Sequence, residues 1–161
     1  MQYRTIDSPI GPLLIAGDHD GLRFLLFGKG RKGSVQPKPE WEPDRGALKD
    51  PAKQLSAYFS GKLRNFDLSL APEGTPFQQG VWGELQRIPY GETISYGELA
   101  RRLGNPRAVR AVGLANGSNP IAIVIPCHRV IGSNGSLVGY GGGLPVKQAL
   151  LALEGGQALL L

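Results

Sequence analysis

The first third of the chain alternates apolar and polar residues in the manner of β-strands. Apolar or alternating runs cover residues 3–7, 13–16 and 22–27, and turn-forming Pro, Gly and Asp residues separate them. Alternation with a period of two gives a strand one apolar face, so these runs predict a three-stranded antiparallel meander. Residues 28–49 are rich in Gly, Pro and Lys and follow no period, which predicts an exposed irregular segment pinned by Trp41.

A helix and a further strand are predicted next. Asp50 stands before Pro51 as an N-cap followed by proline at the first helical position, and Gly61 marks the end of the helix. The helix carries one apolar stripe, formed by Leu55, Tyr58 and Phe59. Residues 66–70 predict one more strand, and residues 71–76 a linker. The front part is therefore expected to be a small α+β unit.

Beyond the linker the apolar spacing becomes helical. Residues 75–78 form a capping box with proline at the first helical position, and apolar residues at helical spacing follow. Residues 95–98 form a second capping box, which starts a helix predicted to end near position 103. The Asn-Pro pair at 105–106 predicts the start of a third helix, and the Asn-Gly pair at 116–117 a left-handed cap at its end.

The second and third of these helices meet at a tight turn around Gly104, which matches a helix-turn-helix. The third helix carries an apolar stripe of Ala108, Val112 and Ala115 and a separate stripe of Arg107, Arg110 and Leu114. The apolar stripe is expected to pack inward and the arginine stripe to face solvent. In this motif the second helix usually enters a DNA groove, although helix pairs of this kind are also common in proteins that never bind DNA.

The rest of the chain predicts a buried strand, a hairpin turn and a closing helix. Residues 121–125 are continuously apolar, and their length and isoleucine content favour a strand that the following proline ends. Residues 133–136 predict a hairpin turn between two short strands, 129–131 and 137–140. A last helix is predicted over residues 145–153.

Composition narrows the class of protein. Of the 161 residues, 41% are hydrophobic and 19% are charged, which is typical of a globular protein. The chain begins without the apolar core of a signal peptide and has no membrane-length apolar run, so we expect a cytoplasmic protein. The formal net charge is +5, and residues 101–129 contain five arginines and no acidic residue. Such a stretch favours a polyanionic partner, with a plain solvated basic surface as the alternative.

Cys127 is the one cysteine of the chain and is followed directly by His128. A single cysteine allows no internal disulfide, and with two histidines in the chain we expect no metal site and no cofactor. A free thiol has a pKa of about 8.5 and needs a nearby base, for which His128 is available. Because adjacent residues of a strand face opposite ways, their contact would need a bridging water or a bend at Pro126. The alternatives are a buried inert thiol and the nucleophile of a cysteine hydrolase.

The residues around Cys127 resemble the active-site signature of the O6-alkylguanine-DNA alkyltransferases, also called methylated-DNA–protein-cysteine methyltransferases. The resemblance covers nearly the whole chain, looks like the bacterial type at the front, and is strongest from position 77 to about 155. The motifs that carry it are Asp7–Leu13, Ile88–Thr93, Ser95–Tyr96, Gly104–Pro106, Arg110–Gly113, Asn116–Pro120, Ile125–Val130 and Gly139–Gly143. These motifs occur in the order that the family has them.

The resemblance implies the chemistry of the site. It makes Cys127 the alkyl acceptor, His128 the base that takes its proton through a water, and Glu154 the carboxylate that orients the histidine. Asn119 matches the residue that ties the recognition helix to the active-site strand, with plain turn chemistry before Pro120 as the alternative.

The resemblance also implies how DNA is bound. Arg110 matches the side chain that fills the gap left by a flipped-out base, and Tyr96 matches the residue that rotates the phosphate and donates a hydrogen bond to the purine. Further DNA contacts are implied for Gly97, Asn105 and Ser133. The substrate pocket is implied at Val130, Tyr140 and Gly141. Several family members have serine where this chain has Gly141. If the family's contact uses the backbone N–H of that residue, glycine keeps it, and if it uses the hydroxyl, this chain lacks it.

The implied fold is α+β, with a ribonuclease-H-like domain at residues 1–74 and a winged helix-turn-helix domain at residues 75–161. The implied activity is irreversible, single-turnover transfer of an alkyl group from O6-alkylguanine in duplex DNA to Cys127, by a protein that acts as a monomer. Two other functions stay open. One is a non-catalytic damage-binding protein, in which the cysteine would be replaced, and the other is a cysteine hydrolase that needs no DNA.

Overall fold

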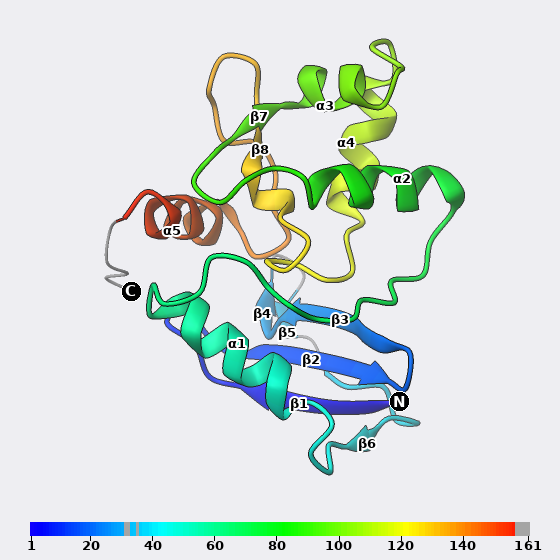
Figure 1. The fold of residues 1–161 in the computed structure, drawn as a ribbon, viewed down its shortest axis with the longest axis vertical. Coiled ribbons are helices and arrows are strands. Elements are labelled where there is room, and N and C mark those ends of the chain that lie inside the picture. The colour runs from blue at the N-terminus through cyan, green and yellow to red at the C-terminus, as the bar shows by residue number, and fades with distance from the viewer. Residues whose placement is uncertain (31–32, 35, 157–161) are drawn as a thin grey trace.

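The computed structural model describes residues 1–30, 33–34 and 36–156, and it shows a sheet-containing N-terminal part beneath a helical C-terminal part (Figure 1). Helices and strands are both present, so the expected α+β class is confirmed. Within the described residues no helix is long and apolar enough to cross a bilayer. The predicted domain boundary near residue 74 falls in the extended segment that joins the two parts.

The N-terminal part is built on a four-stranded sheet with the order β3-β2-β1-β6. Its strands are β1 (Gln2–Ile6), β2 (Leu13–Asp18), β3 (Gly21–Phe27) and β6 (Glu42–Pro43). The first three strands pair antiparallel in chain order, which confirms the predicted meander, and β6 pairs in parallel with β1.

The predicted irregular segment contains only short strands where the structure describes it. β4 (Lys29–Gly30) and β5 (Gly33–Ser34) form a two-stranded pair of their own, while residues 31–32 and 35 lie outside the described residues. Trp41 is 9% exposed, and its ring centroid lies 5.3 Å from that of Phe24 on β3. Trp41 therefore pins this segment against the sheet, as predicted.

Helix α1 (Lys49–Phe59) covers one face of the sheet (Figure 1). Its predicted apolar stripe is confirmed, because Leu55 and Tyr58 are fully buried. The predicted cap at Asp50 is wrong, since that residue lies inside the first turn. The carboxylate of Asp44 instead accepts hydrogen bonds from two backbone N–H groups just before the helix. Gly61 directly follows the C-cap Ser60 and has a φ of 76°, so the predicted end of the helix at Gly61 is confirmed.

The C-terminal part contains four helices, one 3-10 turn and a pair of two-residue strands among its described residues. They are α2 (Pro76–Leu85), β7 (Ile94–Ser95), α3 (Tyr96–Arg102), α4 (Val109–Gly117), η1 (Cys127–Arg129), β8 (Val130–Ile131) and α5 (Leu144–Glu154). Thr75 caps α2 with a complete capping box, and Ser95 caps α3 by accepting from the N–H of Glu98. Gly104, with a φ of 77°, makes the turn between α3 and α4, so the helix-turn-helix is present.

Helix α4 is shorter than predicted. The Asn-Pro pair at 105–106 forms a separate turn, in which the N–H of Ala108 donates to the carbonyl of Asn105, and the helix starts at Val109 without a side-chain cap. The predicted left-handed end is also wrong, because Gly117 is still helical and Ser118, the C-cap, has a φ of −90°. Proline before a helix therefore marked the preceding turn here rather than the first helical residue.

The predicted strand at 121–125 is a compact buried turn. The N–H of Ile125 donates to the carbonyl of Ile121, and Ile123 has a φ of 72°. A short apolar run predicts that the segment is buried, but it does not distinguish a strand from a turn. The hairpin around 133–136 is also wrong. The turn itself forms, but β8 pairs in parallel with β7, and residues 137–140 form no strand.

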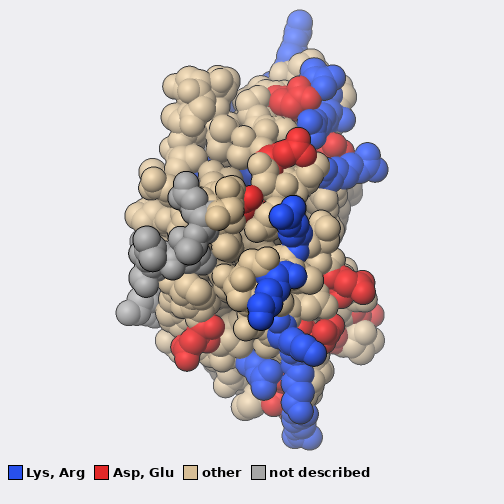
Figure 2. All heavy atoms as spheres, turned by 60° about the vertical axis from the view of Figure 1, so that its left-hand side comes forward, with Lys and Arg blue, Asp and Glu red and all other residues tan. Residues whose placement is uncertain are grey.

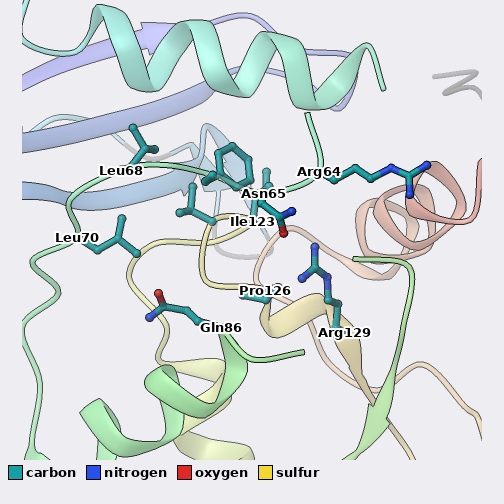
Figure 3. Close-up of a pocket in the computed structure, with 10 residues that line it drawn as sticks. Arg64, Asn65, Leu68, Leu70, Gln86, Ile123, Pro126 and Arg129 are labelled. Atoms are coloured by element: carbon teal, nitrogen blue, oxygen red, sulfur yellow. The ribbon is translucent and has the colours of Figure 1, made fainter. Parts of the chain in front are cut away.

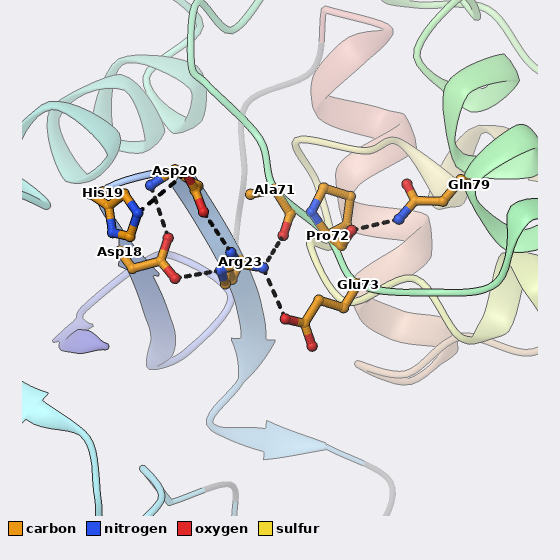
Figure 4. A network of polar contacts seen from close by, with 8 residues as sticks. All are labelled: Asp18, His19, Asp20, Arg23, Ala71, Pro72, Glu73 and Gln79. Carbon is orange, nitrogen blue, oxygen red and sulfur yellow. Dashed lines mark hydrogen bonds and ion pairs between the residues drawn. The ribbon is translucent and has the colours of Figure 1, made fainter.

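Residues 66–70 form no strand either, apart from one bridge between Leu70 and Leu22 of β3. The linker that follows is fixed by Arg23 on β3 (Figure 4). Its guanidinium donates to Asp18, to Asp20, to Glu73 and to the carbonyl of Ala71. A single partly buried cation thus ties the linker to the sheet.

One hydrophobic core runs through both parts. The backbone of Leu25 on β3 donates to the carbonyl of Pro120 at 2.9 Å and accepts from the N–H of Ala122 at 3.2 Å. The core cluster therefore contains side chains from the sheet, from α1 and from all the C-terminal helices. The turn that leads to Cys127 is anchored on the N-terminal sheet.

Candidate active site

Cys127 is the first residue of η1 and is 7% exposed. Pro126, with φ −81° and ψ 65°, bends the chain out of the buried turn and into this 3-10 turn. The sequence placed Cys127 at the end of a strand, which is wrong. Of the two alternatives for bringing Cys127 and His128 together, a bridging water or a bend at Pro126, the structure shows the bend. Cys127 and His128 therefore share one helical turn and do not lie on opposite faces of a strand.

Two asparagines hold the segment that carries Cys127. The side chain of Asn119 donates to the carbonyl of Ile125 at 2.7 Å and accepts from the N–H of Ile121 at 3.0 Å, so it spans the buried turn. Asn116 on α4 donates to the carbonyl of Cys127 at 3.5 Å. The end of α4 and the backbone of Cys127 are thus joined by a direct hydrogen bond.

Glu154, the last residue of α5, is the centre of a buried polar cluster. His128 Nε2 lies 2.8 Å from Glu154 Oε2. Arg129 binds both carboxylate oxygens, with Nε 2.7 Å from Oε1 and Nη2 3.0 Å from Oε2. The hydroxyl of Tyr58 on α1 donates to Oε2 at 2.6 Å. Three elements far apart in the sequence therefore meet at one carboxylate.

The surroundings set the protonation of this cluster. Burial raises the pKa of Glu154, but hydrogen bonds from His128, Arg129 and Tyr58 outweigh it and bring the pKa down to about 2. Burial lowers the pKa of His128 more than Glu154 raises it. At neutral pH the carboxylate is therefore charged and the imidazole neutral. Nε2 then carries the hydrogen that points to Glu154, and Nδ1 is left as a proton acceptor.

Nδ1 of His128 is well suited to take a proton from the thiol. It is buried and has no hydrogen-bond partner among the described residues. Burial raises the pKa of Cys127, whereas Asn119, Lys147 and Tyr140 act in the opposite direction. The thiol therefore needs a base to ionise, and the adjacent histidine is the neutral base available on the same turn.

Lys147 on α5 is a buried cation beside the thiol. Its ammonium donates to the carbonyls of Val130 at 2.7 Å and Val138 at 3.0 Å, and it lies 6.0 Å from the ring centroid of Tyr96. Burial lowers the pKa of Lys147, and a charge on Cys127 raises it. A cation in this place stabilises a thiolate more than a thiol.

The predicted pocket residues differ in burial, and Tyr140 is the one whose side chain interacts with Cys127. Val130 is fully buried, Tyr140 is 7% exposed, and the Tyr140 ring packs on Phe27 of β3 with centroids 5.4 Å apart. Tyr96, the first residue of α3, is partly buried, and its hydroxyl lies 3.5 Å from the carbonyl of Val138. Gly141 is exposed on the loop between β8 and α5.

The predicted DNA contacts are exposed, except for Tyr96, which is partly buried. Arg107 and Arg110 are exposed, and Leu114 on the same stripe is 70% exposed, while Val112 and Ala115 are buried as predicted. The other predicted contacts, Gly97, Asn105 and Ser133, are not buried.

Fewer of the arginines between residues 101 and 129 are unpaired surface charges than the sequence implied. Arg101 and Arg102 are paired with Glu98, which lies just before the acid-free stretch. Arg129 is 7% exposed and is bound to Glu154, so it is no surface charge. Figure 2 shows basic side chains along one side of the molecule with acidic side chains among them.

Two further features do not include the thiol. A pocket between the two parts is lined by Arg64, Asn65, Phe66, Leu68, Leu70, Gln86, Ile123, Val124, Pro126 and Arg129 (Figure 3). It lies beside Arg129 and does not include Cys127. Among the described residues, Asp18, His19 and Asp20 have ligand atoms within 4.8 Å of one another, but Arg23 already binds both carboxylates.

Sequence reasoning missed four residues of the site. Tyr58, Asn116 and Lys147 were assigned to helix faces or not at all, and Arg129 was assigned to the surface. Each is a polar side chain buried within a helical or 3-10 segment. The mismatch between a polar side chain and an apolar stripe was a signal at Tyr58 and at Lys147, but it does not name the partner.

The fold and the site define a class: a two-part protein that presents a helix-turn-helix beside a buried cysteine with its own base and carboxylate. Two family models match this chain. The model described as 6-O-methylguanine DNA methyltransferase, ribonuclease-like domain, covers residues 1–72, and the one described as 6-O-methylguanine DNA methyltransferase, DNA binding domain, covers residues 76–156. The chain belongs to the 6-O-methylguanine DNA methyltransferase family.

Individual relatives agree with this assignment. A methylated-DNA–protein-cysteine methyltransferase of Methanosarcina acetivorans is 54% identical, over 96% of this chain and 99% of the relative. One of Mycobacterium bovis is 55% identical, over 98% of this chain and 94% of the relative. The structure of Mycobacterium tuberculosis OGT in complex with DNA superposes with a TM-score of 0.92, at 54% identity over 99% of this chain and 96% of that one. The resemblance inferred from the sequence is thus confirmed.

Proposed function

We propose that this protein repairs O6-alkylguanine in duplex DNA by transferring the alkyl group to Cys127. The observation that carries the proposal is the thiol on the same 3-10 turn as a neutral, buried His128 whose other nitrogen is held by Glu154. Family membership and the identity to named methyltransferases support the same activity. The protein acts as a monomer in the cytoplasm and needs no cofactor for this step.

The transfer balances with the groups of this chain. His128 Nδ1 accepts the thiol proton, directly or through one water, and the imidazolium is stabilised by Glu154. The Cys127 sulfur attacks the alkyl carbon, so an S–C bond forms and the C–O6 bond breaks. The bonding electrons pass to the purine, which takes up a proton and leaves as guanine. The product is a thioether with no low-energy route back, so each molecule acts once.

The alkyl carbon lies inside a base-paired stack, so the nucleotide must be flipped out before the thiol can reach it, at a cost of a few kcal/mol. Arg110 is exposed on α4 and is proposed to fill the gap in the stack. Tyr96 is proposed to donate its hydroxyl to the purine, and burial raises its pKa, so that the hydroxyl stays protonated. Gly97, Asn105 and Ser133 are proposed to contact DNA, through their backbone or at the phosphates.

The flipped base is proposed to bind between Val130, Tyr140 and Gly141. The ring of Tyr140 packs against the ring of Phe27, which holds it in place and gives the pocket one rigid aromatic wall. A side chain at Gly141 would meet nothing within 4 Å, so this position leaves space in the pocket and offers only its backbone. We therefore propose a backbone N–H contact to the base at this position.

The alternative of a damage-binding protein without transfer is disfavoured by the intact cluster of Cys127, His128 and Glu154. A protein that only binds the lesion has no use for a base and a carboxylate behind a thiol.

The test is to incubate the protein with duplex DNA that carries one O6-methylguanine and to analyse the Cys127 peptide by mass spectrometry. We expect one added methyl group on that peptide and unmodified guanine in the DNA, in a one-to-one ratio. The control is Cys127→Ser, which should bind the same DNA and leave the lesion intact. Binding without methylation of Cys127 in the wild-type protein would overturn the proposal in favour of damage binding. Turnover on ester substrates without DNA would favour a hydrolase.

A further inference from the structure

Tyr58 belongs to the N-terminal part, yet its hydroxyl lies inside the polar cluster of the C-terminal part. It is fully buried on α1 and donates to Oε2 of Glu154 at 2.6 Å across the boundary between the two parts. The ring is fixed on its sides by Phe59, Phe66 and Tyr90, whose centroids lie 5.4, 5.4 and 6.3 Å away. The hydroxyl therefore has a single, fixed direction.

Oε2 is also the atom that binds His128. It accepts from Tyr58 at 2.6 Å, from His128 Nε2 at 2.8 Å and from Arg129 Nη2 at 3.0 Å. Three donors on one carboxylate oxygen share its negative charge, so each one reduces what the oxygen offers to the other two. Burial raises the pKa of Tyr58 far above its usual value, and the hydroxyl therefore stays a donor at every pH at which the protein is folded.

Resting on the proposed alkyl transfer, we propose that Tyr58 is a positioning residue of the reaction: its hydroxyl holds Oε2 of Glu154 and shares the charge that this carboxylate offers to His128. The N-terminal part thus tunes the base that activates Cys127. If the carboxylate of Glu154 did not share its negative charge with Tyr58, it would favour the protonated form of His128. A protonated imidazole cannot accept the thiol proton.

The groups that face this pair come from each element packed against it. They are Tyr58 on α1, Tyr90 after α2, Cys127 and Arg129 on η1, Tyr140 on the following loop, and Lys147 on α5. The cations Arg129 and Lys147 both disfavour a charged imidazole, and Glu154 favours it. Removing the hydroxyl of Tyr58 frees charge on Glu154 for the imidazole, which shifts this balance toward the protonated form.

The test is Tyr58→Phe, which keeps the ring and removes only the hydroxyl. His128 is titrated by the ¹⁵N chemical shifts of its ring in the full-length protein without DNA, so this measurement does not depend on alkyl transfer. We expect the titration midpoint to rise by about 0.5 unit or more. The rate of transfer from O6-methylguanine DNA should then fall at acidic pH and approach the wild-type rate at alkaline pH, because His128 must be neutral to act.

Two controls separate this role from a structural one. Tyr90→Phe removes a neighbouring hydroxyl that lies 3.5 Å from the carbonyl of Leu153 and does not bind Glu154, so the His128 midpoint should stay in place. In a Glu154→Gln background, Tyr58→Phe should no longer move the His128 midpoint, because the effect acts through the carboxylate.

The opposite change gives a test that does not require a stable Phe variant. Incorporation of 3-fluorotyrosine at position 58 makes the hydroxyl a stronger donor with nearly the same shape, so the His128 midpoint should fall. An unchanged His128 midpoint in both variants, with transfer slowed by one factor at all pH values, would overturn the proposal. If Cys127 of the wild type takes up no methyl group, the proposed function is rejected. The His128 titration, which needs no DNA, still decides whether Tyr58 acts on His128 through Glu154.

Discussion

The guanidinium of Arg129 binds both carboxylate oxygens of Glu154, at 2.7 and 3.0 Å, and a third donor, Nη1, reaches the carbonyl of Ile88 at 2.6 Å. This is a buried, two-pronged ion pair, and Glu154 also binds the histidine next to the reactive thiol. The ion pair fixes the carboxylate in place. Together with the bond to Ile88, it also links η1 to the end of α5 and to the segment after α2.

Arg129→Leu should therefore be strongly destabilising. Removing one partner leaves a buried carboxylate without its main counter-charge, which costs about 3–5 kcal/mol in such pairs. The free energy of unfolding in urea at pH 7 measures this. Arg87→Leu is the control, because its side chain is 78% exposed and lies 3.9 Å from Glu84, and it should change stability by about 0.5 kcal/mol or less. Equal losses in the two variants would contradict the assigned role.

Glu154 should also make stability depend on pH in the acidic range. Its pKa is about 2 in the folded protein and 4.5 without the fold, so the folded state favours the charged form. The contribution is therefore fully present above pH 4.5 and is lost as the pH falls toward 2; its size is ~3 kcal/mol at ~1.4 kcal/mol per unit. The difference in unfolding free energy between wild type and Glu154→Gln should shrink over this window. A constant difference would mean that the carboxylate titrates alike in both states.

How much of the fold could be predicted from the sequence depends on how far apart in the chain the interacting residues lie. Strand alternation and helix caps are local, so the meander, the cap at Thr75 and the apolar stripe of α1 were predicted correctly. The turn at 121–125 was not, because it forms by pairing with Leu25, a residue about a hundred positions earlier.

The candidate site divides in the same way. Cys127, His128 and Glu154 were named through a family resemblance; the structure brings His128 and Glu154 into contact and places Cys127 on the same turn as His128. Tyr58 and Arg129 were not named, since their role arises from a contact between segments 25 and 96 positions apart. No spacing rule for helices or strands reaches over such separations.

Asn119 should be needed for transfer and not for DNA binding. Asn119→Asp keeps the shape and an acceptor for the N–H of Ile121 but loses the donor to the carbonyl of Ile125, so the turn before Cys127 loosens. We expect a loss of stability of about 1–3 kcal/mol from the unpaired carbonyl. The transfer rate should fall by about tenfold or more, since a misplaced nucleophile reacts slowly. Single-turnover rates on methylated duplex, with DNA affinity measured alongside, provide the check.

Asn65→Asp is the matched control for this variant. Asn65 is exposed and makes none of the hydrogen bonds that hold the Cys127 segment. Its transfer rate should match that of the wild type. A wild-type rate for Asn119→Asp would show that the turn is held by its buried apolar side chains alone.

Arg110→Ala should separate base flipping from chemistry. Arg110 is exposed on α4, whereas Cys127, His128 and Glu154 are buried, so truncation of the arginine leaves the reacting groups in place. If the side chain fills the gap in the stack, its loss makes flipping less favourable, and transfer from duplex DNA should slow by about tenfold or more. Transfer from the free base O6-benzylguanine requires no flipping and should proceed at close to the wild-type rate.

Arg107→Ala is the control for the Arg110→Ala variant. Arg107 is also exposed but lies in the turn before α4, outside the helix that carries Arg110, so we expect it to neutralise phosphate. Its loss should weaken binding to damaged and undamaged DNA alike and reduce the salt dependence of affinity by about one ion. The rate at saturating DNA should stay unchanged. Equal slowing of duplex and free-base transfer in Arg110→Ala would remove this residue from the flipping step and place it with the groups that support the thiol.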